Sequence, residues 1–416
     1  MLLHFDSRQD IPRPDLDLDF RRGPPLDPRI TFTRNGLLTY LGPDGLLKTA
    51  AINEPAFNWN PAQNRYELQA WEQRANLLLW SEQFDNAAWS KTGLSVTEND
   101  AIAPDGASTA DKLTNTSGIT SLISMVVAVT PSATNDYYPT LYVKRGNIGS
   151  ITLNVYYPGN IEDNVTFFLD SGTQSGAPYG EYMLQNLGSG WYRVGYRMTR
   201  DATGSRASIA YRMWESGRAT GVAGNYHHVW GAQLEEGAFP TPYSKNEGST
   251  ATRGADVISM TGANFSDWFR GDKGTFVVEF TQAVGNNYSG TFRHVLHAVP
   301  TSGVNSSIGI FPSGTNKHTL QVRDGAANQA VIEAGTHLET SKIACSYTKD
   351  AFYVVSNGRE WVSDLSGNAP TTDPLTRMLI GSVQDGNPLG HLNGGIARIR
   401  YWRKALPIGQ LQRLSV

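Results

Sequence analysis

The groups in this chain that could do chemistry are carboxylates and aromatic rings, dispersed among Gly- and Pro-rich segments. Hydrolysis of a glycosidic bond needs two carboxyl groups placed on either side of that bond. The strand pattern GTFVVEFTQ supplies Glu279 alone, and no spacing brings together Asp163, Asp170, Glu181 and Asp201. GxSxG, HExxH, P-loop and GxGxxG patterns are absent from the sequence. We therefore predict no catalytic residue and no enzymatic activity.

Aromatic rings offer a second kind of chemistry, because the C–H face of a sugar ring packs well on a π-face. In GWYRVGYRM, strand alternation places Trp191 with Arg193 on one face, opposite Tyr192, Val194 and Tyr196. Four tyrosines lie in or beside Gly- and Pro-rich loops, where binding often concentrates. We predict carbohydrate contacts for Trp191, Tyr156, Tyr157, Tyr179 and Tyr182. The alternative for each ring is packing in a core, which is the interpretation we give to Trp89 and Trp230.

A long polar turn, VQDGNPLGHLNGG, precedes the last strand pattern of the chain. Rim loops of this kind carry ligands in lectin-like folds, so we add Asp385, His391 and Asn393 to the carbohydrate-binding candidates. A plain solvated turn is the competing interpretation. Trp361 follows a hairpin turn at 357–360 and is expected to pack internally.

Hard oxygen ligands near SEQFDN suggest one metal hypothesis. Glu82 and Asp85, with Glu235 from a later strand, could hold a structural calcium ion. The alternative is ordinary turn chemistry and surface carboxylates. Zinc is not expected, because the eight histidines lack cysteine partners and Cys345 stands alone as a buried apolar group. No other cofactor is predicted.

The elements that must position these groups are short strands. The chain has 416 residues with 42 Gly and 21 Pro, 10% aromatic and 18% charged residues, a mixture that favours strands joined by tight turns. We predict an all-β protein with two β-sandwich (jelly-roll) domains behind an extended N-terminal arm. The arm covers 1–75 and includes a hairpin around the PDG turn. A β-sandwich covers 76–246, a linker 247–262, and a second sandwich 263–416.

Charge and hydropathy exclude two classes of partner. The net charge is −3 and there is no long basic run, so no nucleic-acid footprint is present. No apolar stretch reaches the length of a signal peptide or a membrane span. We expect a protein that is made in a cytoplasm and does not insert into a membrane.

An ordered string of motifs gives a family resemblance over roughly residues 16–265. The segments are LDLDF, LDPRITFTRNGLLTYLGPDGLLKTAAINEPAF, QRANLLLWSEQFDNAAWSKTG, APDGASTADKLT and WGAQLEEGAFPTPY. This string resembles tail-fibre and head-spike fibre proteins of tailed bacteriophages. The closing HLNGGIARIRYW and its amphipathic tail resemble the end of a concanavalin/laminin-G-like jelly roll. The central sandwich is then expected to resemble a carbohydrate-binding module.

The resemblance implies a virion-surface protein, made in the host cytoplasm, that attaches to other virion proteins through its N-terminal arm. It also implies a homotrimer that presents its sandwiches to host cell-surface polysaccharide, on either the tail or the head. The leading hypothesis is therefore a non-enzymatic adhesin. The alternatives are a purely structural decoration, collar or fibre-base protein, and a glycan-degrading spike with two carboxylates in a groove.

Overall fold

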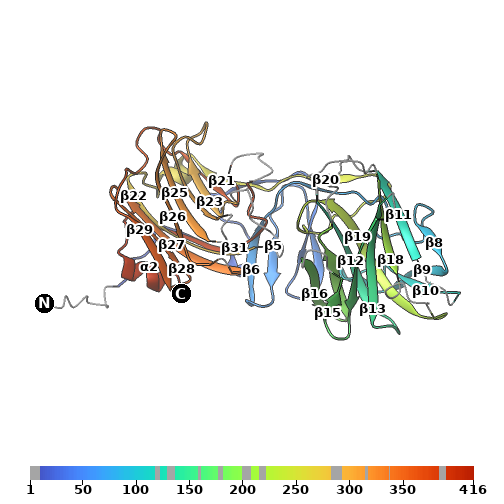
Figure 1. Cartoon of the computed structure of the whole chain (residues 1–416). Helices are drawn as coiled ribbons and strands as arrows, with labels where there is room; N and C mark the ends of the chain where they lie inside the picture. Colours follow the sequence, from blue (N-terminus) through green and yellow to red (C-terminus); the bar gives the residue numbers. More distant parts are fainter. Residues whose placement is uncertain are drawn as a thin grey trace.

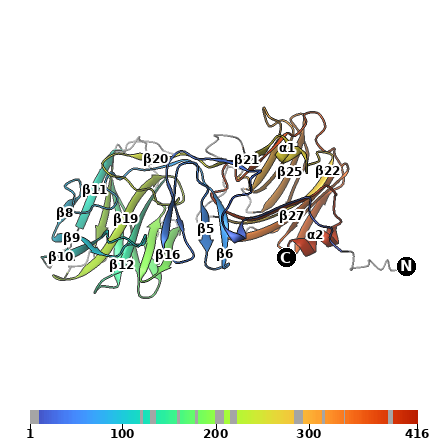
Figure 2. The ribbon, with the colours of Figure 1, turned by 180° about the vertical axis from the view of Figure 1, so that it is seen from behind.

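The structure is a computed structural model that describes most of the chain. The described residues are 10–117, 122–128, 136–157, 161–176, 181–198, 208–214, 222–282, 293–313, 317–336, 338–383 and 390–416. Their regular structure is almost entirely β-strand, arranged as two sandwiches side by side (Figures 1 and 2). The predicted all-β fold class is confirmed. Within the described residues, no helix is long and apolar enough to span a membrane.

The central sandwich packs two antiparallel six-stranded sheets around one apolar core. The first sheet has the order β16 (Tyr182–Gly188), β17 (Trp191–Tyr196), β12 (Tyr137–Arg145), β19 (Tyr226–Glu236), β10 (Ala110–Asn115) and β9 (Leu94–Ala101). The second has the order β15 (Thr173–Ser175), β14 (Ile161–Phe168), β13 (Ser150–Tyr157), β18 (Ser208–Trp214), β11 (Leu122–Ala128) and β8 (Ser90–Thr92).

The C-terminal sandwich packs an eight-stranded sheet on a seven-stranded one. The larger sheet has the order β29 (Glu360–Asp364), β28 (Ala351–Ser356), β27 (Thr340–Thr348), β22 (Lys273–Gln282), β31 (Gly394–Trp402), β6 (Arg65–Ala70) and β5 (Phe57–Asn60), with β1 (Leu16–Asp19) also on β31. The smaller has the order β2 (Thr31–Thr33), β21 (Val257–Thr261), β30 (Arg377–Ile380), β23 (Leu296–Val299), β24 (Ser307–Pro312), β25 (His318–Asp324) and β26 (Ala327–Ala334). Helix α1 (Ala263–Ser266) follows β21, and α2 (Ile408–Leu414) covers part of the outer face of the larger sheet.

The expected free N-terminal arm is wrong, because its strands complete the C-terminal sandwich. Strand β1 pairs with β31 in the register Leu16↔Tyr401, and β6 pairs with the other half of β31. The alternating side chains of Leu16 and Leu18 point into the core of the C-terminal sandwich, so this segment is part of that core. The pairing also covers a strand that would otherwise be an open edge. The central sandwich is thus inserted into a discontinuous domain, as the blue strands beside β31 in Figure 1 show.

The predicted linker at 247–262 is also wrong in part, since two strands lie there. Strand β20 (Ala251–Arg253) pairs with β7 (Arg74–Asn76), so the two chain crossings between the sandwiches run together. Strand β21 belongs to the smaller C-terminal sheet. A double crossing held by backbone hydrogen bonds restrains the two sandwiches more than a single polar linker would.

The predicted hairpin around the PDG turn is confirmed as β3 (Leu38–Leu41) and β4 (Leu47–Ala50). It leaves the C-terminal sandwich and packs on the outer face of the central one. There Leu41 and Leu47 join an apolar cluster with Trp191, Trp230 and Tyr243. The hairpin therefore bridges the two sandwiches.

A buried polar junction fixes the crossing. Asp256 accepts hydrogen bonds from the Trp71 amide at 2.8 Å and from Arg34 at 3.2 Å, and both charged side chains are fully buried. Glu72 pairs with Arg293 at 3.2 Å, and its other contacts include Arg74 and Asn393. Paired buried charges of this kind are costly to break.

Candidate functional site

A cavity of about 300 Å³ lies where the β3–β4 hairpin meets the central sandwich, and we call it the hairpin pocket. Five stretches of chain build it: the hairpin region, the segment after β7 that holds Glu82, the β9–β10 loop that holds Asp105, strand β19, and the returning segment up to β20. Its lining residues are Gly36, Leu37, Thr39, Leu47, Thr49, Glu82, Asp105, Trp230, Tyr243, Ser244, Lys245, Thr252 and Arg253. Ligand pockets in proteins begin at about this volume, roughly 300 Å³, so it suits a single small ring.

Charged groups line one side of the hairpin pocket. The Glu82 carboxylate accepts a hydrogen bond from the Tyr243 hydroxyl at 2.9 Å and pairs with Lys245 at 3.0 Å. Burial raises the pKa of Glu82, and the charge of Asp105 nearby adds to that shift. The buried Arg253 Nε has no hydrogen-bond partner within the described residues. The pocket thus combines acceptors at Glu82 and Asp105 with a donor at Lys245.

Aromatic rings form a rigid floor beside these groups. Trp230 and Tyr243 lie with ring centroids 4.8 Å apart, and the Trp230 indole N–H donates to Thr109 Oγ1 at 3.1 Å. Tyr142 completes the cluster at 5.3 Å from Trp230. Such packing holds the rings in one orientation. Trp230 and Tyr243 are only 2% and 1% exposed, so the rings hold the wall of the pocket in place and a ligand would mainly meet the polar groups.

A larger hollow of about 520 Å³ lies on the crossing, lined by Thr33, Arg34, Asn35, Ile52, Asn53, Gln73, Gly254, Ala255 and Val257. Its only charged lining residue, Arg34, is already bonded to Asp256 and to backbone carbonyls at Ala51 and Glu54. This hollow therefore offers less chemistry to a ligand than the hairpin pocket does.

The alternation predicted for β17 is confirmed, but sugar stacking on Trp191 is wrong. Val194 and Tyr196 face the central core, and Trp191 faces outward as expected. The outward face is nevertheless covered, and Trp191 is only 3% exposed. Its indole N–H donates to the Ile102 carbonyl at 3.1 Å. The ring belongs to a buried cluster with Ala103 and with Leu41 and Leu47 of the hairpin, which strand alternation could not reveal.

The loop tyrosines have different outcomes. Tyr182 lies at the start of β16 and is 38% exposed, so its candidacy stays a prediction. Tyr156 and Tyr157 end β13, but their side chains lie outside the described part of the structure. Tyr179 lies outside the described residues altogether.

The rim-loop candidates His391 and Asn393 are wrong as exposed ligand contacts, because both are buried. His391 Nε2 lies 3.1 Å from the Asp256 carbonyl oxygen, and Asn393 donates to Glu72 Oε2 at 2.8 Å. Both side chains serve the junction between the sandwiches. Asp385 lies outside the described residues. Trp361, expected to pack internally, is instead 48% exposed because β29 is an edge strand.

The predicted calcium ligands do not converge. Glu235 accepts from the Thr241 amide at 2.9 Å and from the Thr241 hydroxyl, while Glu82 is bonded within the hairpin pocket. Asp85 is exposed. Within the described residues, no three His, Cys, Asp or Glu side chains form a metal-binding group. Protein donors satisfy the buried carboxylates one by one, so this hypothesis is wrong. The lone Cys345 is buried, as expected.

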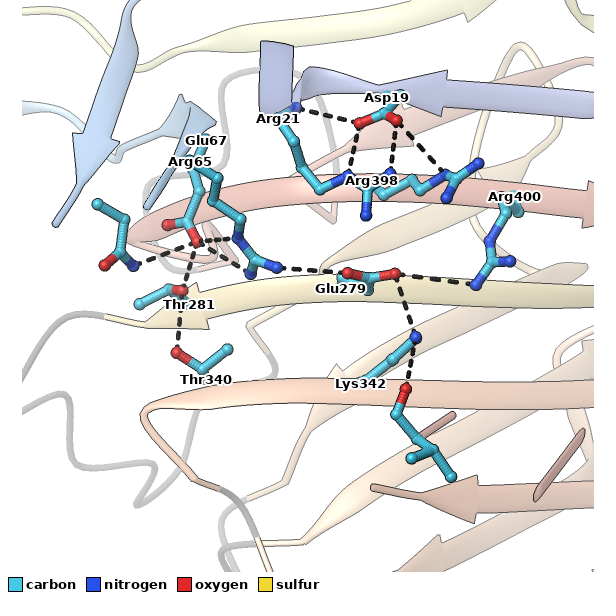
Figure 3. A network of polar contacts seen from close by, with 12 residues as sticks. Asp19, Arg21, Arg65, Glu67, Glu279, Thr281, Thr340, Lys342, Arg398 and Arg400 are labelled. Carbon is cyan, nitrogen blue, oxygen red and sulfur yellow. Dashed lines mark hydrogen bonds and ion pairs between the residues drawn. The ribbon is translucent and has the colours of Figure 1, made fainter. Parts of the chain in front are cut away.

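A second polar surface lies on the outer face of the larger C-terminal sheet, beside α2, and we call it the charged face (Figure 3). It comprises Asp17, Asp19, Arg21, Arg65, Glu67, Glu279, Lys342, Arg398 and Arg400. Glu279 on β22 lies 3.3 Å from Arg65, 3.4 Å from Lys342 and 3.8 Å from Arg400. These pairs join the N-terminal strands β1 and β6 to β22, β27 and β31.

The charged face contains a carboxylate pair that sequence reasoning missed. Glu67 and Glu279 both bond to Arg65, at 3.1 and 3.3 Å. Only the pairing of β6 with β31 brings Glu67 near β22, so no local motif could have found it. A glycosidase needs free space for the scissile bond between its two carboxyl groups. Here the Arg65 guanidinium bonds to both carboxylates and takes up that space (Figure 3).

Comparisons with known proteins give only distant structural similarities. No protein-family model and no curated protein matches the chain. The CBM40 module of the Ruminococcus gnavus IT-sialidase, bound to α2,3-sialyllactose, is 15% identical; the match covers 35% of this chain and 83% of that one, with a TM-score of 0.30. NanB sialidase from Streptococcus pneumoniae is 15% identical over 37% of this chain and 26% of its own, with a TM-score of 0.30. A SAP-like pentraxin from Limulus polyphemus is 12% identical over 35% and 70%, with a TM-score of 0.29.

Proposed function

We propose that this chain is a non-enzymatic glycan-binding adhesin on the surface of a tailed-bacteriophage virion. The observation that carries the proposal is the hairpin pocket, in which Glu82, Asp105 and Lys245 line a cavity of about 300 Å³ backed by a buried aromatic cluster. Sugar hydroxyl groups can donate to the carboxylates of Glu82 and Asp105 and accept from Lys245. The virion assignment is supported by the ordered motifs over residues 16–265.

The discontinuous architecture suits display on a particle. The double crossing and the buried junction hold the two sandwiches together, so a ligand bound in the hairpin pocket is held in a defined orientation to the C-terminal domain. We infer a homotrimer attached to other virion proteins, in which repeated weak sites multiply the overall affinity. Attachment to other virion proteins then uses the surface of the folded domains, because the N-terminal strands β1, β5 and β6 belong to the C-terminal sandwich.

The alternative of a purely structural virion protein has one observation in its favour. Trp191, His391 and Asn393 are all buried in protein contacts. A glycan-degrading spike is less well supported, because Arg65 takes up the space between Glu67 and Glu279.

The test is binding of the purified full chain to an array of bacterial capsular polysaccharides and lipopolysaccharides, with reducing ends assayed in the same samples. Asp105→Asn keeps the acceptor for the Ala107 amide yet removes a negative charge from the pocket, and Lys245→Gln removes the positive charge. We expect saturable binding that both variants weaken, without sugar release, because Lys245→Gln removes the positive charge that pairs with Glu82. The exposed Lys349→Gln serves as the matched control and should bind as the unmodified chain does.

Absence of binding by a folded, assembled sample would favour the structural role. Sugar release would contradict the non-enzymatic assignment. Labelling of purified particles with an antibody against the chain tests the virion location separately, and unlabelled particles would refute it.

A further inference from the structure

We propose that the hollow on the crossing, which we call the crossing hollow, is a second ligand site and that it holds an uncharged sugar unit. Its volume of about 520 Å³ lies within the range of roughly 300–1,000 Å³ that ligand pockets occupy. It lies beside the segment 254–256, which joins β20 to β21 between the sandwiches (Figure 1). Different residues line the hairpin pocket, so this proposal goes beyond the adhesin site there and can fail or succeed independently of it.

The one charged residue among the described lining residues of the crossing hollow, Arg34, is not open to a ligand. Its side chain is fully buried. Its Nε and both terminal nitrogens already donate, to Asp256 at 3.2 Å and to the carbonyl oxygens of Gly36, Ala51 and Glu54 at 3.2, 2.8 and 2.8 Å. A bound molecule therefore meets uncharged groups, and a charged ligand would gain no ion pair from this lining.

Uncharged hydrogen-bonding groups line the crossing hollow instead. The exposed Asn35 and Gln73 side chains make no hydrogen bond to any described residue, and the same holds for the Thr33 hydroxyl. Asn53 accepts from the Arg34 amide through its Oδ1 at 3.0 Å, and within the described part of the chain its Nδ2 has no acceptor. Side-chain amides and hydroxyls offer both donors and acceptors, as each sugar hydroxyl does. The lining and a sugar are therefore complementary without any charge.

Backbone hydrogen bonds fix the walls of the crossing hollow. The Gly254 amide donates to the Asn35 carbonyl oxygen at 2.6 Å, and the Asn53 amide donates to the Arg34 carbonyl oxygen at 3.0 Å. Strand β2 pairs with β21, and β7 pairs with β20, so the other stretches that line the hollow are also joined. A ligand that enters such a preformed site orders little of the backbone, and less of its binding free energy is lost.

Apolar groups complete the lining and favour a sugar over an inorganic ion. Ile52 is 57% exposed, and Ala255 and Val257 are half-buried at the same hollow. Contact with the C–H groups of a sugar ring would remove this apolar surface from water. A metal ion would need carboxylate or carbonyl ligands and an anion would need a free cation. The described lining side chains supply neither a carboxylate nor a free cation.

The test is saturation-transfer-difference NMR of the full chain with the methyl glycosides of glucose, galactose, mannose, rhamnose and N-acetylglucosamine. We expect at least one of them to bind at millimolar concentration, with the same affinity at low and high NaCl because no ion pair forms. Asn35→Ala and Gln73→Ala should each weaken this binding by about two- to tenfold, the effect of losing one neutral hydrogen bond. The matched control is Gln63→Ala, an exposed glutamine on the turn between β5 and β6 that lines neither cavity, and it should bind as the unmodified chain does.

Further variants separate this site from folding and from the hairpin pocket. If Asn35→Ala or Gln73→Ala does not fold, Thr33→Val keeps the β-branched shape of a strand residue and should weaken binding by a similar factor. Lys245→Gln reports on the hairpin pocket. The proposal would be overturned if the folded chain bound none of the glycosides, or if high salt abolished binding. It would also be overturned if Lys245→Gln weakened binding while the variants of the crossing hollow did not.

Discussion

Replacing Asp256 with Asn should loosen the junction between the two sandwiches. Asp256 is fully buried, as is the side chain of its partner Arg34, and the largest effect on its pKa is a rise caused by burial. Its neighbour Arg253 is also buried and carries a second positive charge. The substitution keeps the size of the side chain but removes the ion-pair partner of Arg34 and the larger of the two carboxylate charges that act on Arg253. Breaking a buried ion pair from one side typically costs about 3–5 kcal/mol.

The structure gives the size and place of the expected effect. Neither side chain of the Asp256–Arg34 pair is exposed, so solvent does not screen their charges. In the variant, Arg34 stays bonded to the carbonyls of Ala51 and Glu54, and Arg253 to that of Glu72. We therefore expect a loss of about 3–5 kcal/mol in the free energy of unfolding of the C-terminal sandwich. For a domain of this size, Tm should fall by about 2–4 °C for each kcal/mol.

Calorimetry and hydrogen exchange would measure this change. The amide of Trp71 donates to Asp256, so peptides that contain it should lose protection first. The double variant Asp256→Asn with Arg34→Gln should be less destabilised than the sum of the single variants. Asp364→Asn, on the exposed edge strand β29, should change Tm little. A loss below about 1 kcal/mol in Asp256→Asn would refute the assignment of a dry, charge-paired junction.

Three further outcomes follow from buried groups. Burial raises the pKa of Asp111 to about 6, so the folded protein binds this proton more tightly than the unfolded chain. The contribution of Asp111 to the free energy of unfolding should fall by up to about 3 kcal/mol as pH rises from 4 to 6. Chemical denaturation measured across this pH range should show that Asp111→Asn lacks this fall. Trp191→Ala should cost about 3–5 kcal/mol in chemical denaturation, because the ring is buried under the hairpin; a loss below 1 kcal/mol would show that the face is open. Cys345 is buried and burial raises its pKa, so a thiol reagent should label it only after denaturation, and rapid labelling of native protein would contradict its placement.

Local sequence patterns were sufficient for the elements and for some of their faces. The alternation in GWYRVGYRM correctly separated Trp191 from Tyr196 because successive strand side chains point to opposite sides. The PDG turn located the β3–β4 hairpin because turn residues restrict the backbone locally. The same kind of information predicted the all-β class and the burial of Cys345, Trp89 and Trp230.

Tertiary structure alone decided what covers each face and which distant residues meet. Alternation identified an outward face on β17, but only the tertiary packing of the cluster that joins Trp191 to Leu41, Leu47 and Ala103 shows that this face is covered. The hairpin pocket needs Asp105 and Lys245 from the central sandwich beside residues 36–49, and the charged face needs Glu67 beside Glu279. Such contacts depend on how sheets pair and pack over long separations, whereas periodicity reports only the geometry of neighbouring residues. The sequence by itself therefore determined strands, turns and fold class, and the long-range strand pairing determined the sites.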